Sequence, residues 1–146
     1  MDAAWPLLEE IGMPSGASRD RLVFESNIEK AVANADFVQE NVPERATLKT
    51  DVHAEISRHT RPGVVVASSS SGLLPSDIQS QSIRPESHLV GHPFAPVYLL
   101  PLVEVVGGEK TNEQAINAAG TFYASIGMRP LRVRKEIDAS IADRLQ

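Results

Sequence analysis

The sequence predicts an α/β protein whose mostly parallel sheet is covered by helices on both faces. Two observations support this prediction. Short β-branched runs, such as residues 64–68, alternate along the chain with segments whose apolar residues recur at helical spacing, such as 44–60. The length of 146 residues is that of one domain, which can bury a core of ordinary proportions.

The individual elements are read from apolar spacing and from the residues that cap or end them. Gly12 and Gly127 suit the ends of two helices, and Ser26 or Asn27 suits the start of another. The strands expected at 89–92 and 103–106 are consecutive and can run antiparallel. In chain order we expect a helix over 5–11, a strand at 22–24, a helix over 28–32, a strand at 36–40, a helix over 44–60, strands at 64–68, 89–92 and 103–106, a helix over 112–126 and a strand at 130–133.

Composition and charge exclude several classes of function. The net charge of −5 at pH 7 argues against nucleic acid or an anionic membrane as the main partner. The absence of cysteine excludes a disulfide scaffold, a thiolate nucleophile and a zinc–thiolate site. The apolar runs are too short to cross a membrane, and the acidic start does not resemble a signal peptide. We therefore predict a cytoplasmic location.

One histidine and one glutamate stand in neighbouring apolar strands. His92 ends the first strand, and Glu104 lies in the second, with prolines at 93, 96 and 101 stiffening the turn between them. Two strands joined in this way can hold an imidazole against a carboxylate, as a proton-transferring enzyme requires. The spacing alone does not decide between this interpretation and a structural histidine beside an unrelated glutamate.

A serine-rich segment follows the strand at 64–68. Ligands of open α/β sheets bind outside the carboxyl ends of the strands, so the hydroxyls at 68–71 could meet a cofactor or a substrate oxygen. Taken alone, the segment fits better a turn that leads into a helix beginning at Pro75 or Ser76.

Several motifs together resemble the 3-hydroxyacyl-CoA dehydrogenase superfamily. Within it, the chain is most similar to the branch of L-carnitine 3-dehydrogenase and L-gulonate 3-dehydrogenase (lambda-crystallin). The motifs are Ser-Ser-Ser-Ser-Gly-Leu-Leu-Pro-Ser at 68–76, His-Pro-Phe-Ala-Pro at 92–96, Leu-Val-Glu-Val at 102–105, Ala-Asp-Phe-Val-Gln-Glu-Asn-Val-Pro-Glu-Arg at 35–45 and Lys-Glu-Ile-Asp at 135–138.

This resemblance implies an NAD-dependent enzyme that oxidises the 3-hydroxyl of a small L-3-hydroxy acid or acyl thioester. His92 matches the family's general base, and Glu104 matches the carboxylate that orients it. Ser71 matches the serine that binds the reacting oxygen and lies near the cofactor. Glu40 matches an acidic residue near the nicotinamide ribose, and Asp143 takes the place of a substrate-binding asparagine.

The chain also departs from the family pattern. Ala95 replaces an asparagine that usually follows His-Pro-Phe, and Asp-Ala-Ser at 138–140 replaces a Pro-Gly-Phe turn. The sequence contains no Gly-x-Gly-x-x-Gly, the loop that cradles the pyrophosphate in this family. We therefore expect an incomplete Rossmann-like, doubly wound sheet, with a partial NAD-binding domain at 1–134 and the start of a link to a helical domain at 135–146.

Two functional alternatives follow from these departures. One is a dehydrogenase, active within a complete chain that forms a homo-oligomer, a dimer in the family. The other is a non-catalytic remnant or a structural, crystallin-like protein of the same fold. An unpartnered strand edge would make the 146 residues either a fragment or an obligate oligomer.

The remaining histidines are expected to have no function. His53 and His59 lie six residues apart on one predicted helix, which is not the spacing of two metal ligands, and both are expected to be solvated. His88 is expected at the surface. We predict no metal site.

Overall fold

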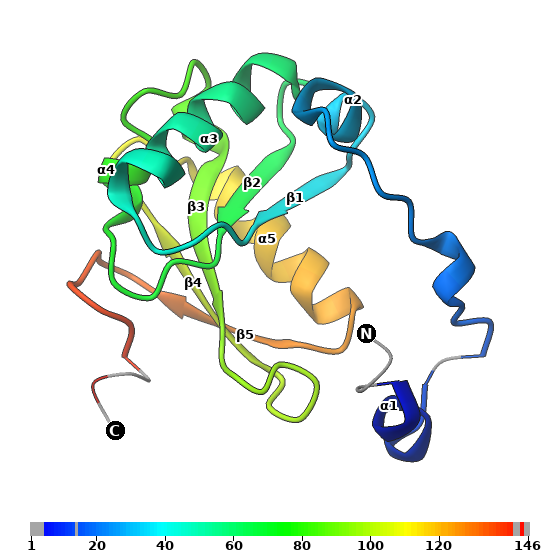
Figure 1. Ribbon diagram of the computed structural model, residues 1–146. Helices are drawn as coiled ribbons and strands as arrows, with labels where there is room; N and C mark the ends of the chain where they lie inside the picture. Colours follow the sequence, from blue (N-terminus) through cyan, green and yellow to red (C-terminus); the bar gives the residue numbers. More distant parts are fainter. Residues whose placement is uncertain (1–4, 14, 142–143, 145–146) are drawn as a thin grey trace.

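A five-stranded sheet with helices on both faces forms the body of the computed structural model, which describes residues 5–13, 15–141 and 144 (Figure 1). This architecture confirms the predicted α/β class. The strands are β1 (Phe37–Glu40), β2 (Val65–Ser68), β3 (His88–Pro93), β4 (Leu102–Gly107) and β5 (Arg129–Val133). The helices are α1 (Trp5–Ile11), α2 (Ile28–Val32), α3 (Ala46–His59), α4 (Pro75–Ile78) and α5 (Glu113–Ser125), with short 3₁₀ turns at Arg19–Arg21 and Pro85–Ser87.

The strands follow one another in the sheet in their chain order, β1-β2-β3-β4-β5. β1, β2 and β3 are parallel, β4 runs antiparallel to β3, and β5 is parallel to β4. The antiparallel pairing of β3 with β4 agrees with the sequence expectation. It places His92 directly opposite Glu104.

Alternation along the strands separates two packed layers. Val65 and Ala67 of β2 face α5, where they pack with Ala119 and Tyr123. Val66 points the other way, into a cluster that contains Ile56 of α3. Because side chains alternate between the faces of a sheet, one helix layer covers each side of β2.

The side of β3 and β4 opposite α5 carries the candidate site. Val90 of β3 and Val106 of β4 pack there against Ile78 of α4. His92 and Glu104 each lie two residues from one of these valines, so they face the same side of the sheet. The local pattern therefore directs both polar side chains to the face that α4 borders.

Asparagine side chains cap two helices, and the first of them, Asn27, was one of the two cap candidates in the sequence. The side chain of Asn27 accepts a hydrogen bond from the Lys30 amide at the start of α2, and Asn112 accepts one from Ala115 at the start of α5. Each cap satisfies an amide that lacks a partner within its own helix. Gly127 has φ of 85° directly after α5, a conformation that favours glycine.

The strand expected at 22–24 is wrong. Val23 and Phe24 are residue types that favour strands, but they are 88% and 96% exposed, and no strand of the described sheet pairs with them. A β-branched or aromatic run becomes a strand only where a neighbour supplies hydrogen bonds and a surface to pack on. Among the residues described, no helix is long and apolar enough to cross a membrane.

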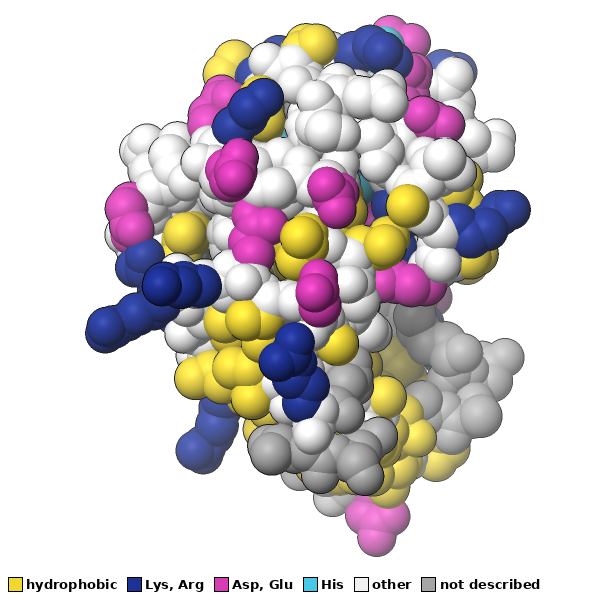
Figure 2. Space-filling view, turned by 90° about the vertical axis from the view of Figure 1, so that its left-hand side faces the viewer, with side chains coloured by type: hydrophobic (Ala, Val, Ile, Leu, Met, Phe, Trp, Pro, Cys, Tyr) yellow, Lys and Arg dark blue, Asp and Glu magenta, His cyan; other side chains and the backbone are white. Residues whose placement is uncertain are grey.

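The face that carries α4 and the C-terminal segment has a mixed surface. Figure 2 shows Lys and Arg side chains interspersed with Asp and Glu over this face, with hydrophobic side chains between them. A mixture of this kind does not form the continuous basic stripe that tracks a nucleic-acid backbone.

Candidate active site

The loop at 69–74, called the serine loop below, connects β2 to α4 and is held by one carboxylate. Glu44 Oε1 accepts hydrogen bonds from the amides of Ser71 and Gly72, at 3.2 and 3.0 Å, and from the hydroxyl of Ser70. Burial raises the pKa of Glu44, but the bonds from Ser70 and Gly72 and the charge of Lys49 outweigh it and lower this pKa. An ionised Glu44 therefore fixes the backbone of the loop.

The serine loop brings Ser71 to His92. The Ser71 hydroxyl oxygen lies 3.1 Å from Nε2 of His92, at the end of β3. On the other side of the ring, Nδ1 lies 3.5 Å from Oε2 of Glu104. His92 is 7% exposed and Glu104 is 2% exposed, so a charge on the imidazole would be stabilised by the carboxylate with little screening by water. The imidazole of His92 thus lies between a hydroxyl on one side and a carboxylate on the other, and the three groups are called a line below.

A cavity opens beside this line of groups. Its lining includes Ser71, His92, Glu104 and the apolar side chains of Val90 and Val106. Residues 137 and 139–141 also line it. The amide of Ser140 donates a 2.8 Å hydrogen bond to the carbonyl of Ser71, so the C-terminal segment is attached to the serine loop.

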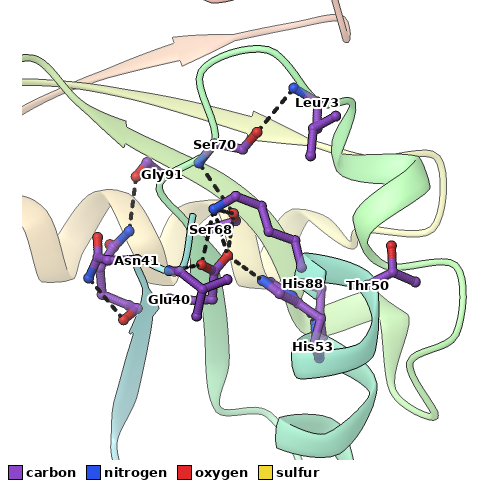
Figure 3. A network of polar contacts seen from close by, with 12 residues as sticks. Glu40, Asn41, Thr50, His53, Ser68, Ser70, Leu73, His88 and Gly91 are labelled. Atoms are coloured by element: carbon purple, nitrogen blue, oxygen red, sulfur yellow. Dashed lines mark hydrogen bonds and ion pairs between the residues drawn. The ribbon is translucent and has the colours of Figure 1, made fainter. Parts of the chain in front are cut away.

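Glu40 lies at the end of β1 and is enclosed by its own chain. Lys49 Nζ lies 3.0 Å from Oε1, while the Ser68 hydroxyl donates a 2.6 Å bond to Oε2 (Figure 3). Burial raises the pKa of Glu40, but hydrogen bonds from His53, Ser68 and Lys49 outweigh it and lower this pKa to about 2. With 4% exposure, the carboxylate is ionised and directed to internal donors, so the ribose contact expected for it stays a prediction.

Two histidines that were expected in solvent are buried, and these predictions are wrong. His53 is 0% exposed and His88 is 1% exposed. Their Nδ1 atoms lie 2.8 Å apart, and Nε2 of His53 lies 3.3 Å from Oε2 of Glu40. Lys49, His53 and Ile56 have the spacing of residues on one face of α3, and all three are buried. The prediction rested only on the spacing of His53 and His59 and therefore missed this sign of burial.

The other predicted positions have different outcomes. His59 is partly exposed and lies 3.0 Å from the Glu55 carboxylate. Asp143 lies outside the described residues. Within the part of the chain that the structure describes, no group of three or more histidine, aspartate or glutamate side chains could hold a metal ion.

Comparisons with known proteins agree on one family. The family model described as "3-hydroxyacyl-CoA dehydrogenase, NAD binding domain" matches residues 14–137. The matched domain is described as one that binds NAD, which confirms the predicted cofactor.

Similar proteins extend well beyond this chain. L-carnitine dehydrogenase of Pseudomonas putida is 58% identical over 142 residues, which are 97% of this chain and 44% of that protein. L-carnitine dehydrogenase of Bacillus cereus is 52% identical over 145 residues, 99% of this chain and 44% of that protein. The crystal structure of an NAD⁺-dependent dismutase, a 5-dehydrogenase acting on a pyridine carboxylic acid, superposes with a TM-score of 0.88 at 32% identity and covers 99% of this chain and 47% of that one. The chain thus spans less than half the length of these relatives.

Proposed function

Because the chain belongs to the 3-hydroxyacyl-CoA dehydrogenase family, we propose that it supplies the proton-transferring residues and part of the NAD site of an L-3-hydroxy acid dehydrogenase. L-Carnitine is the proposed substrate, since L-carnitine dehydrogenases share 52–58% of its residues. The observation that carries the proposal is the line formed by Ser71, His92 and Glu104 at the edge of one cavity.

In this proposal each of the three residues has a part in alcohol oxidation. We propose that the imidazole carries its hydrogen on Nδ1, which lies 3.5 Å from Oε2 of Glu104, so that Nε2 can accept a proton. Nε2 takes the proton of the substrate's 3-hydroxyl, and the carboxylate stabilises the resulting imidazolium. Ser71 lies next to Nε2 and donates its hydroxyl hydrogen to the same oxygen. NAD, when bound, would supply the acceptor for the hydride of C3, so the alcohol would lose two electrons with that hydride and its hydroxyl proton to Nε2 of His92.

The residues present fit the nicotinamide end of the cofactor. The serine loop and the Glu44 carboxylate, whose side chain is 43% exposed, lie at the carboxyl ends of parallel strands, where nucleotides bind in sheets of this type. Such a carboxylate can accept hydrogen bonds from ribose hydroxyls. The 146 residues contain no Gly-x-Gly-x-x-Gly loop, so the proposal is confined to the nicotinamide end and does not include the pyrophosphate.

The test is NADH formation by the whole protein with L-carnitine, compared with D-carnitine, L-gulonate and 3-hydroxybutyryl-CoA. We expect saturable turnover with L-carnitine, and His92→Ala should remove most of it while leaving NADH affinity nearly unchanged. His59→Ala is the matched control, because this histidine lies on the outer part of α3 and should leave turnover within about twofold.

Three outcomes would contradict parts of the proposal. A His92→Ala variant with near-normal turnover would refute the role of His92. Faster turnover of L-gulonate or of 3-hydroxybutyryl-CoA than of L-carnitine would refute L-carnitine as the substrate. No NADH formation with any of the substrates would favour the non-catalytic, structural alternative.

A further inference from the structure

A buried polar cluster under the serine loop has no part in the proposed chemistry. It joins Glu40 from β1, Lys49 and His53 from α3, Ser68 from β2 and His88 from β3 (Figure 3). All five side chains are at most 4% exposed. Buried ionisable groups are rare unless they are paired, so the cluster must satisfy its own hydrogen bonds.

The contact between the two histidines holds one proton. Their Nδ1 atoms are 2.8 Å apart, so one of these nitrogens donates and the other accepts. Nε2 of His53 faces the ionised Glu40 at 3.3 Å and therefore carries a hydrogen. The tautomer of His53 that carries its hydrogen on Nε2 accepts at Nδ1 from Nδ1–H of His88.

Burial keeps His88 uncharged. It lowers the pKa of His88 to about 3, and the nearby His53 and Arg84 lower it further in smaller amounts. His88 is therefore neutral at neutral pH and donates a single ring hydrogen. The Ser82 hydroxyl also lies within hydrogen-bond distance of Nδ1 of His88, at 3.3 Å.

The cluster continues to the candidate active site through Lys49. Its ammonium lies 3.0 Å from Oε1 of Glu40 and 3.5 Å from Oε2 of Glu44. Glu44 in turn accepts the amides of Ser71 and Gly72. One ammonium thus stands between two carboxylates, and the second of these holds the loop that places Ser71 beside His92.

We propose that His53, oriented by His88, is a positioning residue for Ser71. It holds Glu40 in the orientation that keeps Lys49 against Glu44, and Glu44 keeps Ser71 within hydrogen-bond distance of His92. The catalytic consequence rests on the proposed function, whereas the geometric consequence, the environment of His92, does not. The competing explanation is that the two histidines only pack α3 on the sheet.

Two conservative variants separate these explanations. The amide nitrogen of glutamine reaches the position of Nε2, so His53→Gln keeps the bond to Glu40 and loses the one to His88. The shorter asparagine reaches the position of Nδ1, so His53→Asn keeps the bond to His88 and loses the one to Glu40. Each variant gives up one buried hydrogen bond, so the two variants are expected to lose similar amounts of stability.

The readout that does not depend on activity is the imidazole nitrogen NMR signal of His92. With four histidines in the chain, single variants suffice to assign the signals, and Ser71→Ala supplies the spectrum of a His92 without its hydroxyl neighbour. We expect the His92 signal to stay at its wild-type position in His53→Gln and to move toward that of Ser71→Ala in His53→Asn. In turnover, kcat should fall about tenfold or more in His53→Asn with little change in KM, and much less in His53→Gln, since small displacements of catalytic groups are costly.

Equal His92 signals and equal kcat in the two variants would overturn the proposal and leave only a packing role. If His53→Asn does not fold, Glu40→Gln tests the next link, because it keeps an acceptor for His53 but removes the charge that holds Lys49. An unmoved His92 signal in Glu40→Gln would likewise refute the proposal. Should wild-type protein form no NADH, the proposed function fails while the NMR comparison still decides this inference.

Discussion

Glu104 lies directly opposite His92 in the antiparallel pairing of β3 with β4, and its Oε2 is 3.5 Å from Nδ1 of the imidazole. Residues directly opposite each other in such a pair have neighbouring side chains on the same face of the sheet. A slip of one residue in the pairing would move Glu104 to the face covered by α5. The register of two strands is therefore what joins the proposed base to its carboxylate.

Glu104→Gln should lower turnover without abolishing cofactor binding. The amide keeps the size of the side chain but removes the negative charge that would stabilise an imidazolium on His92, which is 7% exposed. We expect kcat to fall on the order of 10²-fold, within the range of general acid–base effects, while NADH affinity changes little. Steady-state kinetics with a fluorescence titration of NADH check both. Unchanged kcat would show that Glu104 does not support proton transfer.

The fold could be predicted because its signals are local. β2 begins in a run of three valines at 64–66, α5 has helical apolar spacing and a capping asparagine, and Gly127 follows the end of that helix. The segment at 22–24 carries the same local signal as a strand but has no partner in the described sheet. A strand needs a neighbour, which local sequence does not specify.

The buried histidines were mispredicted for a related reason. His53 and His88 are 35 residues apart in the chain, and His53 is 13 residues from Glu40. Their burial depends on three elements meeting at one point of the fold. A histidine on a helix is usually solvated. The local sign that His53 is buried is that it shares a helix face with Lys49 and Ile56.

The stability of the protein should fall as the pH drops from about 6.5. His88 has a folded-state pKa of about 3, below its ordinary value of 6.5, because it is buried and lies near His53 and Arg84. Between these values the unfolded chain binds one proton more than the folded chain, so the free energy of unfolding decreases as the pH falls. The lowered pKa of Glu40, about 2, adds a loss of the same sign below pH 4.5.

Urea unfolding between about pH 7 and pH 5 isolates the contribution of His88. A single extra proton corresponds to a slope of up to about 1.4 kcal/mol per pH unit. His88→Asn should remove this slope, whereas His59→Ala, at a partly exposed position, should not. A slope that persists in His88→Asn would assign the pH dependence to other groups.

Gly91→Ala should destabilise the fold strongly. A Cβ at this position of β3 would lie 2.0 Å from the hydroxyl oxygen of Tyr123 and 2.8 Å from its ring. Tyr123 is 4% exposed and donates its hydroxyl hydrogen to Gln39, which in turn donates to the Gly91 carbonyl, so it has no room to retreat. We expect a loss of about 1–3 kcal/mol or more, measured by urea unfolding.

Gly120→Ala in α5 is the matched control for that substitution. Nothing lies within 4 Å of a Cβ built at Gly120, so the methyl group meets open space. Alanine is the better helix former, and a gain of about 0.5–1 kcal/mol is expected. A Gly91→Ala protein as stable as Gly120→Ala would mean that Tyr123 does not pack on β3 as described.

Ala139→Gly should stabilise the segment that borders the candidate site. Ala139 has φ of 63°, in the left-handed region that favours glycine. The next residue, Ser140, donates its amide hydrogen to the carbonyl of Ser71, so the turn at Ala139 directs the chain onto the serine loop. Glycine adopts this backbone without the clash of a Cβ, and we expect a gain of about 0.5–1 kcal/mol with turnover retained.

The opposite substitution at a second left-handed position calibrates this gain. Gly127 has φ of 85°, and a Cβ built there meets nothing within 4 Å, so Gly127→Ala carries the conformational cost alone and should lose about 1 kcal/mol. Urea unfolding of the two variants, monitored by far-ultraviolet circular dichroism, gives the two free energies under one set of conditions. A destabilised Ala139→Gly beside a destabilised Gly127→Ala would show that the turn at Ala139 is not left-handed in solution. The attachment of Ser140 to the serine loop would then have to arise from another backbone path.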